Sequence, residues 1–406
     1  MTALLNKGAL EAGPTAPADV RIRSLDAVRG LALFGVLAIN LDSEFRVTLF
    51  EQFLPVAVAS APAVDRLVAA LLTFFVEFKA FAIFSLLYGV GLAMQFDRLP
   101  ETVRFRVLVR RLFVLLLFGV IHLTIIWNGD ILTEYAIAGL LVLPLVGCSR
   151  RVLAMAAGAA MLVYLAMPWV PLPFSFPSPD WINDHVISAR AAYSAGSFGE
   201  VLSFRIAELP QIAKLHIYVF PRTVALILLG ALIWRSGALR SGAGGRASIL
   251  RAGAVSVGVG ALLSFMATPG GWGFGAIGWM ETASANIAPV FLALGYAALI
   301  WTVSSSRLRL LVNWAAPAGQ MAFTNYIMQS VVLGLLFYGY GAGLMGQVGV
   351  SAGLGISAAL FIAQVFVSSR WLQSHRYGPL EWAWRSLTYG SAQPWQRPTS
   401  KGALPI

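Results

Sequence analysis

The fold of this chain is decided by one apolar stretch, Leu25-Asp-Ala-Val-Arg-Gly-Leu-Ala-Leu-Phe-Gly-Val-Leu-Ala-Ile-Asn-Leu41. As a helix it would rise about 25 Å, close to the thickness of the hydrocarbon layer of a bilayer. Its strongly polar side chains, Asp26, Arg29 and Asn40, lie near one another around the helix axis. Because charges in lipid are costly, the stretch predicts a membrane helix whose polar stripe faces other helices. The alternative is a surface helix that begins with an Asp–Arg pair.

The composition extends this prediction to the whole chain. Of its 406 residues, 58% are hydrophobic and only 12% are charged, whereas a soluble domain carries about 25% charged residues. We therefore predict an all-α, polytopic transmembrane helix bundle that forms one domain. The single cysteine, Cys148, excludes an intramolecular disulfide and a multi-thiolate metal site. The four histidines show no metal-ligand spacing, so no metal is expected.

Apolar segments separated by charged or Gly- and Pro-rich loops predict about ten spans. The segment 63–96 has a helical pattern throughout, and because it is too long for one crossing, its first half is expected along the outer surface. The expected divisions are a disordered cytoplasmic tail (1–20), a transmembrane domain (21–390) with an extracytoplasmic loop at about 168–215, and a flexible tail (391–406). The loop is expected to begin as a Pro-rich connection and to continue as a polar amphipathic helix. The predicted spans are 25–44, 77–96, 112–127, 131–148, 152–167, 216–234, 252–267, 281–303, 318–338 and 350–369.

Basic residues are distributed unevenly between the two predicted sides of the membrane. With ten spans, 22 of the 29 Lys and Arg residues fall on the side that holds both termini. Cytoplasmic loops carry such an excess, so both termini are predicted to be cytoplasmic. The net charge of +11 is then explained by the orientation of the protein in the membrane. Binding to nucleic acid has no further support. The lipid bilayer is the expected partner, and a homodimer is left open.

The best candidate for acid–base chemistry is His122, because an imidazole changes its protonation near neutral pH. Asp130 and Glu134 follow it across an Asn-Gly turn. One helical turn separates these two acids, so their carboxylates share a face. A structural histidine is the alternative for His122, and a helix cap is the alternative for Asp130.

Other polar side chains in or beside the predicted spans are candidates for binding. Snorkelling at the interface and hydrogen bonding between helices are their structural alternatives. The candidate substrate-binding residues are Asp26, Lys79, Glu134, Asn325 and Gln329. Guanidinium groups at inner helix ends fit phosphates, although they also serve the charge bias between the two sides. The candidate cofactor-binding residues are Arg29, Arg110 and Arg111.

Several motifs are spread over nearly the whole chain after residue 20. They are Leu25-Asp-Ala-Val-Arg-Gly with Asn40, Phe84-Ser-Leu-Leu-Tyr-Gly-Val-Gly91, Gly119-Val-Ile-His122 with Asn128-Gly-Asp-Ile-Leu132, Met321-Ala-Phe-Thr-Asn-Tyr326 and Gly378-Pro-Leu-Glu-Trp-Ala-Trp-Arg385. Taken together, these motifs resemble those of the YeiB-like bacterial membrane proteins, which carry a domain of unknown function.

The opening motif also resembles the wider integral-membrane acyltransferase superfamily, which includes sugar O-acetyltransferases and the lysosomal heparan glucosaminide N-acetyltransferase. The resemblance implies a bundle of about ten helices that moves an acyl group from a cytosolic acyl-CoA, most simply acetyl-CoA, to an acceptor hydroxyl or amine. In the glucosaminide enzyme an Asn ends the first helix and a His follows in the next loop. Asn40 matches that Asn, whereas no His lies between Asp42 and Arg66.

We therefore expect a membrane acyltransferase of the bacterial cytoplasmic membrane. His122 would be the general base, Asp130 would orient it, and Asn40 would stabilise the oxyanion. A polar cavity should join the inner arginines to His122. The main alternative is a transporter of a small polar or lipid-linked substrate, because ionisable residues within a membrane serve either role. A non-catalytic scaffold or sensor is a third interpretation.

Overall fold

The computed structural model describes residues 23–54, 61–171, 174–240, 243–268 and 278–397. Within these ranges the regular elements are helices, and an isolated β-bridge pairs His375 with Gln396. The predicted all-α class is confirmed. The predicted tail at 1–20 and residues 398–406 of the predicted C-terminal tail lie outside the described residues.

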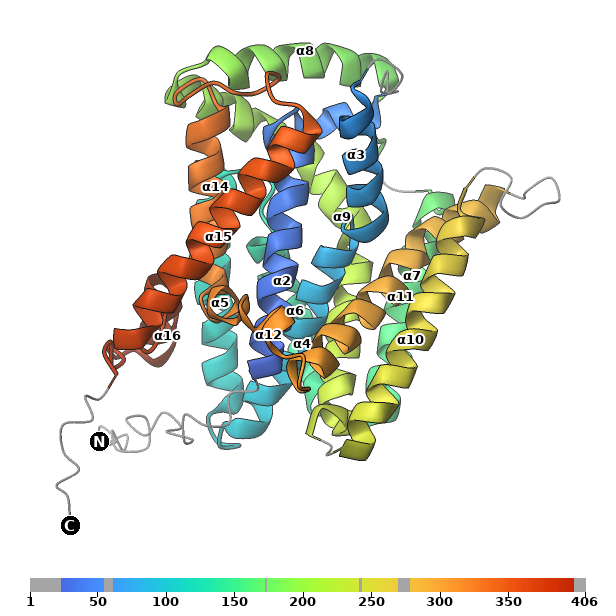
Figure 1. The fold of residues 1–406 in the computed structure, drawn as a ribbon, viewed down its shortest axis with the longest axis vertical. Helices are drawn as coiled ribbons and strands as arrows, with labels where there is room; N and C mark the ends of the chain where they lie inside the picture. Colours follow the sequence, from blue (N-terminus) through green and yellow to red (C-terminus); the bar gives the residue numbers. More distant parts are fainter. Residues whose placement is uncertain (1–22, 55–60, 172–173, 241–242, 269–277, 398–406) are drawn as a thin grey trace.

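Helix α2 (Arg23–Asn40) runs through the centre of the bundle and continues as a π-helical turn, η2 (Leu41–Phe45) (Figure 1). This agrees with the helix predicted at 25–44. A Cβ atom on Gly30 would fall 2.1 Å from the carbonyl oxygen of Ala315, so α2 meets the start of α13 (Ala316–Gln320) backbone to backbone. Only glycine permits so close an approach.

The long helical segment predicted at 63–96 is broken in the structure. Helix α3 (Ala63–Phe75) and helix α4 (Lys79–Arg98) are separated by a turn at Phe78, whose φ of 60° is left-handed. The ammonium of Lys79 donates to the carbonyl of Thr73 at 2.7 Å and so satisfies the end of α3. Helix α4 agrees with the span predicted at 77–96. A bulky residue rarely adopts a left-handed conformation, and apolar periodicity carries no sign of one, so the turn itself was not predicted.

Helices α6 (Leu132–Val146) and α7 (Arg150–Ala166) agree with two predicted spans. Helix α5 (Arg104–Ile121) contains the start of the span predicted at 112–127 but begins earlier, because its basic first turns are helical as well. Helix α5 ends in a second π-helical turn, η5 (His122–Ile126). Short connections make consecutive helices neighbours, and α5 packs against α6. The loop from η5 to α6 is thereby held at one end of this pair.

The region predicted as an extracytoplasmic loop at 168–215 is mostly helical. After the short η6 (Met167–Trp169), α8 (Pro179–Ala195) lies across one end of the bundle (Figure 1). Helix α9 (Phe198–Ser236) then runs as one element about 58 Å long, so the span predicted at 216–234 is only its second half. Its first half agrees with the polar amphipathic helix expected before residue 216, and it carries the buried residues Arg205 and Glu208.

The remaining helices surround α2 and α4. Helices α10 (Ala243–Met266) and α11 (Gly278–Ser304) pair on one side of the bundle. Helix α14 (Ala322–Phe337) packs against α2, and the carboxylate of Glu381 accepts hydrogen bonds from two backbone N–H groups at its start. The other elements are η3 (Leu49–Phe53), η7 (Ala238–Arg240), α12 (Leu310–Asn313), α15 (Val350–Ser374) and α16 (Pro379–Tyr389).

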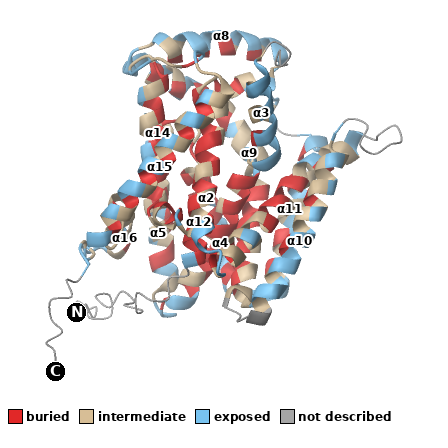
Figure 2. Ribbon diagram, in the orientation of Figure 1, coloured by how far each residue is buried: buried red, intermediate tan, exposed pale blue. Residues whose placement is uncertain are grey.

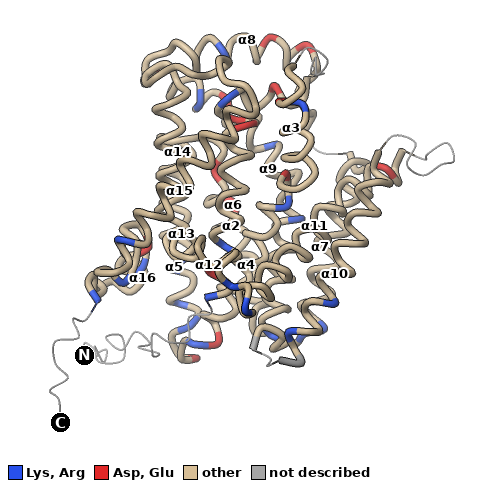
Figure 3. The backbone as a smooth tube through the Cα atoms, viewed as in Figure 1, with Lys and Arg blue, Asp and Glu red and all other residues tan. Residues whose placement is uncertain are grey.

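Eight helical segments of the described chain are long and apolar enough to cross a membrane, and α6 and α14 are shorter apolar helices. Buried residues line the centre of the bundle, whereas exposed ones cover its outside (Figure 2). Many exposed side chains on the outer helices are large and apolar, which is typical of a surface that faces lipid. Lys and Arg gather at the end where α4 and α9 end and α5 and α10 begin (Figure 3).

Candidate functional site

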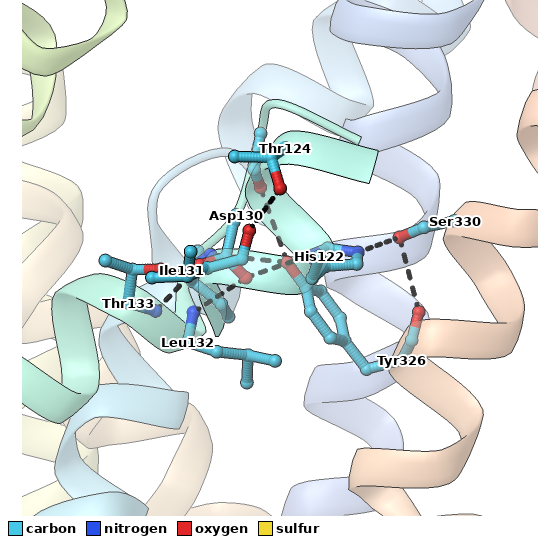
Figure 4. A network of polar contacts seen from close by, with 10 residues as sticks. His122, Thr124, Asp130, Ile131, Leu132, Thr133, Tyr326 and Ser330 are labelled. Atoms are coloured by element: carbon cyan, nitrogen blue, oxygen red, sulfur yellow. Dashed lines mark hydrogen bonds and ion pairs between the residues drawn. The ribbon is translucent and has the colours of Figure 1, made fainter. Parts of the chain in front are cut away.

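The centre of the candidate site is His122, the first residue of η5. Its Nδ1 lies 2.7 Å from Oδ1 of Asp130, and its Nε2 lies 3.0 Å from Oγ of Ser330 on α14. Figure 4 shows the imidazole between these two partners. All three residues are buried. When Nδ1 donates to the carboxylate, Nε2 is free to accept the single hydroxyl proton of Ser330, for which the backbone carbonyl of Tyr326 at 3.4 Å is the other acceptor.

Asp130 holds the imidazole and also satisfies the free backbone N–H groups at the start of α6. Its carboxylate accepts the backbone N–H of Leu132 at 3.1 Å and that of Thr133 at 2.7 Å. The sequence offered a helix cap and a partner for His122 as alternatives, and the structure shows both arrangements together. A carboxylate has enough lone pairs for all three donors.

Close contact between α5 and α6 brings His122 to Asp130. A Cβ on Gly119 would fall 2.5 Å from the backbone nitrogen of Thr133, so a side chain there would push the start of α6 away. The hydroxyl of Tyr326 lies 3.4 Å from the carbonyl oxygen of Gly129 and holds the connecting loop from the side of α14.

Both π-helical turns of the structure adjoin this site. The N–H of Trp127 donates to the carbonyl of His122 at 2.7 Å, and that of Arg46 donates to Leu41 at 2.8 Å, each across five residues. Helix α14 packs against both turns. Such wide turns are rare and frequently occur at functional sites.

Two buried acceptor atoms lie beside η2 without a hydrogen-bond partner in the described part of the chain, Oδ1 of Asn40 and Oε2 of Glu44. A Cβ on Gly129 would fall 2.3 Å from Oε2 of Glu44, which places this carboxylate against the loop that carries Asp130. Asn40 caps the same turn, but no contact joins it to His122 directly.

A second imidazole–carboxylate pair follows on α9. Nδ1 of His216 lies 2.7 Å from Oε2 of Glu134, and the hydroxyl of Thr223 donates to the other oxygen of Glu134. His216 is also close enough to Asp130 and Glu44 to be attracted by both carboxylates. Glu134 therefore has His216 and Thr223 as partners, and its pair with His216 lies near Asp130, the partner of His122.

A third pair lies under α8. Nε2 of His185 is 2.6 Å from Oε1 of Glu208, and Oε2 of Glu208 accepts from the amide of Asn128 at 2.8 Å. Nη1 of the fully buried Arg205 donates to the carbonyl of Ile125 at 2.8 Å and so supports the end of η5. The first half of α9 thus fixes the loop on which the candidate site is built.

The three arginines predicted to hold phosphates are not gathered in one place. Nη1 of Arg29 lies 3.0 Å from Oδ1 of Asp26, and these two residues close the contact of α2 with α13. The guanidinium of Arg111 stacks 3.5 Å from the centre of the Trp384 ring on α16, and Arg110 approaches Gly390 after the same helix. Asp26 and Arg29 therefore act as a structural pair in this contact.

The other candidate substrate-binding residues have partners away from His122. The amide of Asn325 donates to Oγ of Ser368 at 3.0 Å, and that of Gln329 donates to Oε1 of Gln364 at 2.8 Å. Both contacts join α14 to α15, which is the interhelical role that the sequence offered as an alternative. Lys79 satisfies the end of α3, as described above.

Among the pockets on the described part of the chain are two that His122 does not line. One, of about 770 Å³, lies between α10 and α11, and the other, of about 350 Å³, lies beside η6. Neither is lined by Arg29, Arg110 or Arg111, so neither is the predicted cavity from these arginines to His122.

Sequence reasoning missed several members of this constellation. Ser330 belongs to a polar set on a predicted span, but its pairing with His122 joins residues 208 positions apart. Glu44 is the last residue of the span predicted at 25–44, and His216 is the first residue of the span predicted at 216–234. Neither residue therefore interrupts an apolar run. Polar residues at span ends were the available signal.

Two kinds of known sequence match this chain: a family model matches part of it, and whole proteins match nearly all of it. A family model described as a protein of unknown function, DUF418, matches residues 233–391 and so includes Ser330 but not His122. The chain is 32% identical over 399 residues to the uncharacterized protein YxaH of Bacillus subtilis, with 92% of this chain and 96% of that protein covered.

Two further relatives match over similar lengths. The uncharacterized protein YeiB of Escherichia coli is 29% identical, with 93% of this chain and 99% of that protein covered. An uncharacterized 39.9 kDa protein of Bacillus acidopullulyticus is 26% identical, with 93% and 96% covered. Because these matches extend over nearly the whole helical bundle, the chain belongs to the YeiB-like family, whose shared domain has no known function.

Proposed function

We propose that the protein is a membrane acyltransferase in which Ser330, His122 and Asp130 act as nucleophile, base and orienting acid. The observation that carries this proposal is the imidazole with a carboxylate 2.7 Å from Nδ1 and a hydroxyl 3.0 Å from Nε2. This order of groups activates a hydroxyl for acyl transfer in unrelated folds.

The transfer proceeds in two half-reactions. Oγ of Ser330 attacks the carbonyl carbon of an acyl-CoA while Nε2 of His122 takes the hydroxyl proton. The C–S bond then breaks, and the thiolate leaves with that proton, which gives an acyl ester on Ser330 and free CoA. An acceptor hydroxyl or amine next gives its proton to Nε2 and attacks the ester carbonyl. The bond between the acyl carbon and Oγ then breaks, and Nε2 returns the proton to Oγ, which restores Ser330. Asp130 stays ionised and stabilises the imidazolium.

Asn40 and Glu44 are the residues that we assign to binding of the molecule that receives the acyl group. Oδ1 of Asn40 and Oε2 of Glu44 are both buried without a hydrogen-bond donor among the described residues, and that of Glu44 lies against the loop that carries Asp130; a buried acceptor without a donor is costly. An acceptor molecule with several hydroxyl or amine groups would satisfy both. The amide N–H of Asn40 is then the group that we assign to the developing oxyanion.

Both substrates need an opening, because Ser330 and His122 are buried. We assign this opening to η2 and η5, the two π-helical turns that pack against α14. π-Helical turns are rare and frequently occur at functional sites, which supports this assignment. Movement of either turn away from α14 would expose Nε2 of His122.

The proposed topology has ten spans. Helices α6 and α14 add to the eight longer apolar segments, and both termini then lie on the side that carries most of the Lys and Arg residues. By the charge rule this side is the cytoplasm, and the membrane is the bacterial inner membrane. An acyl-CoA would arrive from this side.

The test is to incubate purified protein with acetyl-CoA labelled in the acetyl group and to measure CoA release and label retained on the denatured protein. We expect label on the wild type and none on Ser330→Ala or His122→Gln. The matched control is Ser357→Ala, because Ser357 is also a buried serine on a neighbouring helix. Label that persists on Ser330→Ala would exclude Ser330 as the acyl carrier, and a wild type that releases no CoA would remove the whole proposal.

The second candidate function is proton-coupled transport. Its specific support is that three imidazoles, those of His122, His185 and His216, each lie 2.6–2.7 Å from a buried carboxylate. Such pairs can pass protons within a membrane. Proton flux into proteoliposomes, read with an enclosed pH dye, without any cleavage of the thioester would favour this function over acyl transfer.

A further inference from the structure

A pocket at the basic end of the bundle shares no lining residue with the candidate site. It has a volume of about 770 Å³ and lies where α10 begins and α11 ends. Its size is within the range of pockets that hold small molecules. Its lining contains none of the arginines predicted to hold phosphates, and it contains none of Ser330, His122 and Asp130.

The charge of this pocket has one sign. Arg246, Arg307 and Arg309 line it, and no acidic residue does. Nη1 of Arg246 donates to the backbone carbonyl of Ser305 at 2.9 Å, which holds this guanidinium across the pocket. For the side chains of Arg307 and Arg309, the described residues supply no ion pair.

The hydroxyl groups of the pocket are already engaged. Thr302 donates to the carbonyl of Ala298 at 2.7 Å, and Ser306 donates to that of Val303 at 2.8 Å. The hydroxyls of Ser305 and Ser24 lie 2.9 Å apart and tie this wall to α2. The arginines are therefore the groups that remain to bind a ligand.

We propose that this pocket binds a ligand that carries a diphosphate or two phosphate groups. Guanidinium forks match phosphate oxygens in pairs, and three of them around one pocket exceed what a single carboxylate needs. Leu250 adds an apolar wall, so the phosphates belong to a larger molecule. Its source is either a soluble nucleotide such as CoA or the headgroup of an anionic lipid, because both present the same chemistry to this end of the bundle.

This inference does not rest on the acyltransferase proposal. A phosphate site at this end would serve a donor nucleotide if acyl transfer occurs, and it would serve a lipid or another nucleotide if it does not. Binding is therefore measured without turnover. The Ser330→Ala variant should bind as the wild type does, which separates a failure of the pocket from a failure of the chemistry.

The experiment measures binding of inorganic diphosphate and of CoA to the purified full-length protein in an uncharged detergent by isothermal calorimetry. We expect the double variant Arg307→Gln, Arg309→Gln to bind at least about tenfold more weakly, which corresponds to about 1.4 kcal/mol. The matched control is Arg251→Gln, because Arg251 lies on the same helix α10 but does not line the pocket. This control should bind within about twofold of the wild type.

A lipid arm separates the two sources. The protein is reconstituted in phosphatidylcholine with or without phosphatidic acid, and its unfolding temperature is compared between the double variant and the control. Stabilisation by phosphatidic acid that needs Arg307 and Arg309 supports a lipid ligand, and calorimetric binding that needs them supports a nucleotide. Equal weakening by Arg251→Gln would show diffuse surface charge and overturn the proposal, as would a wild type that responds to none of the three probes.

Discussion

At the scale of single residues, Asp130 has the most demanding position in the structure. One carboxylate binds Nδ1 of His122 and also accepts the first free N–H groups of α6. The helix would be satisfied by any acceptor oxygen there, whereas the imidazole needs a negative charge to stabilise its protonated form. The two demands are separable by substitution.

We predict that Asp130→Asn separates them. Its amide oxygen still caps α6, so the free energy of unfolding should change by less than about 1 kcal/mol. Acyl transfer should fall on the order of 100-fold or more, because the charge that stabilises the imidazolium is gone. Urea unfolding in mild detergent and the CoA-release assay measure the two effects. Asp130→Ala is the control that should lose both, and an active Asp130→Asn would show that the charge has no role.

The sequence brought His122 and Asp130 together because they lie eight residues apart across a tight turn. It placed Ser330 in the polar set of the span 318–338 but could not pair it with His122, because nothing in an apolar helix shows which neighbour each face will meet. It also proposed a substrate role for Gln329, one residue before Ser330, although the amide of Gln329 is directed to α15. Adjacent helical residues point about 100° apart, so a one-residue difference decides between interhelical contact and site.

At the scale of elements, the motif that begins α2 is explained by contact with α13. Asp26 and Arg29 bind each other and reach α13, and Gly30 lets the two backbones touch. The sequence identified this motif but assigned it to ligands. Residues that pack two segments so closely tolerate as little change as residues that bind a substrate, so the motif alone did not distinguish the two roles.

We predict opposite effects for the same substitution at two glycines. Gly30→Ala should lower the free energy of unfolding by about 2 kcal/mol, because the new methyl group would fall 2.1 Å from a backbone oxygen. Gly91→Ala, on α4, has no atom within 4 Å of the new methyl and should be neutral or stabilising by up to about 1 kcal/mol. Tryptophan fluorescence during thermal unfolding compares them. Equal destabilisation by both would contradict the close contact.

Helix existence followed from apolar periodicity, but the special turns did not. The break at Phe78 and the turns η2 and η5 change the backbone without changing the apolar pattern. The polar helix expected before residue 216 was not joined to the span at 216–234, because the partners that satisfy its polar residues, such as Asn128 for Glu208, are distant in sequence. Local patterns contain no record of such partners.

At the scale of the whole molecule, the proposed topology places the α6–α7 connection in the cytoplasm and α8 outside. The single cysteine offers a direct test, because Cys148 lies in that connection and is partly exposed. We predict that a membrane-impermeant maleimide labels it in inside-out vesicles but not in intact cells. A Cys148→Ser, Ser188→Cys variant moves the thiol to exposed α8 and should show the reverse. Labelling of both positions from one face would contradict ten spans.

Helix α9 connects the two ends of the molecule in a single element. Its first half carries Glu208 under α8, its middle carries His216 beside Glu134, and at its far end Trp234 donates to Asp97 at 2.9 Å. Pro210 and Pro221 lie between these contacts and remove two internal hydrogen bonds of the helix. The helix has fewer internal hydrogen bonds on both sides of His216, so we expect any bend between its two halves to occur next to the pair of His216 and Glu134.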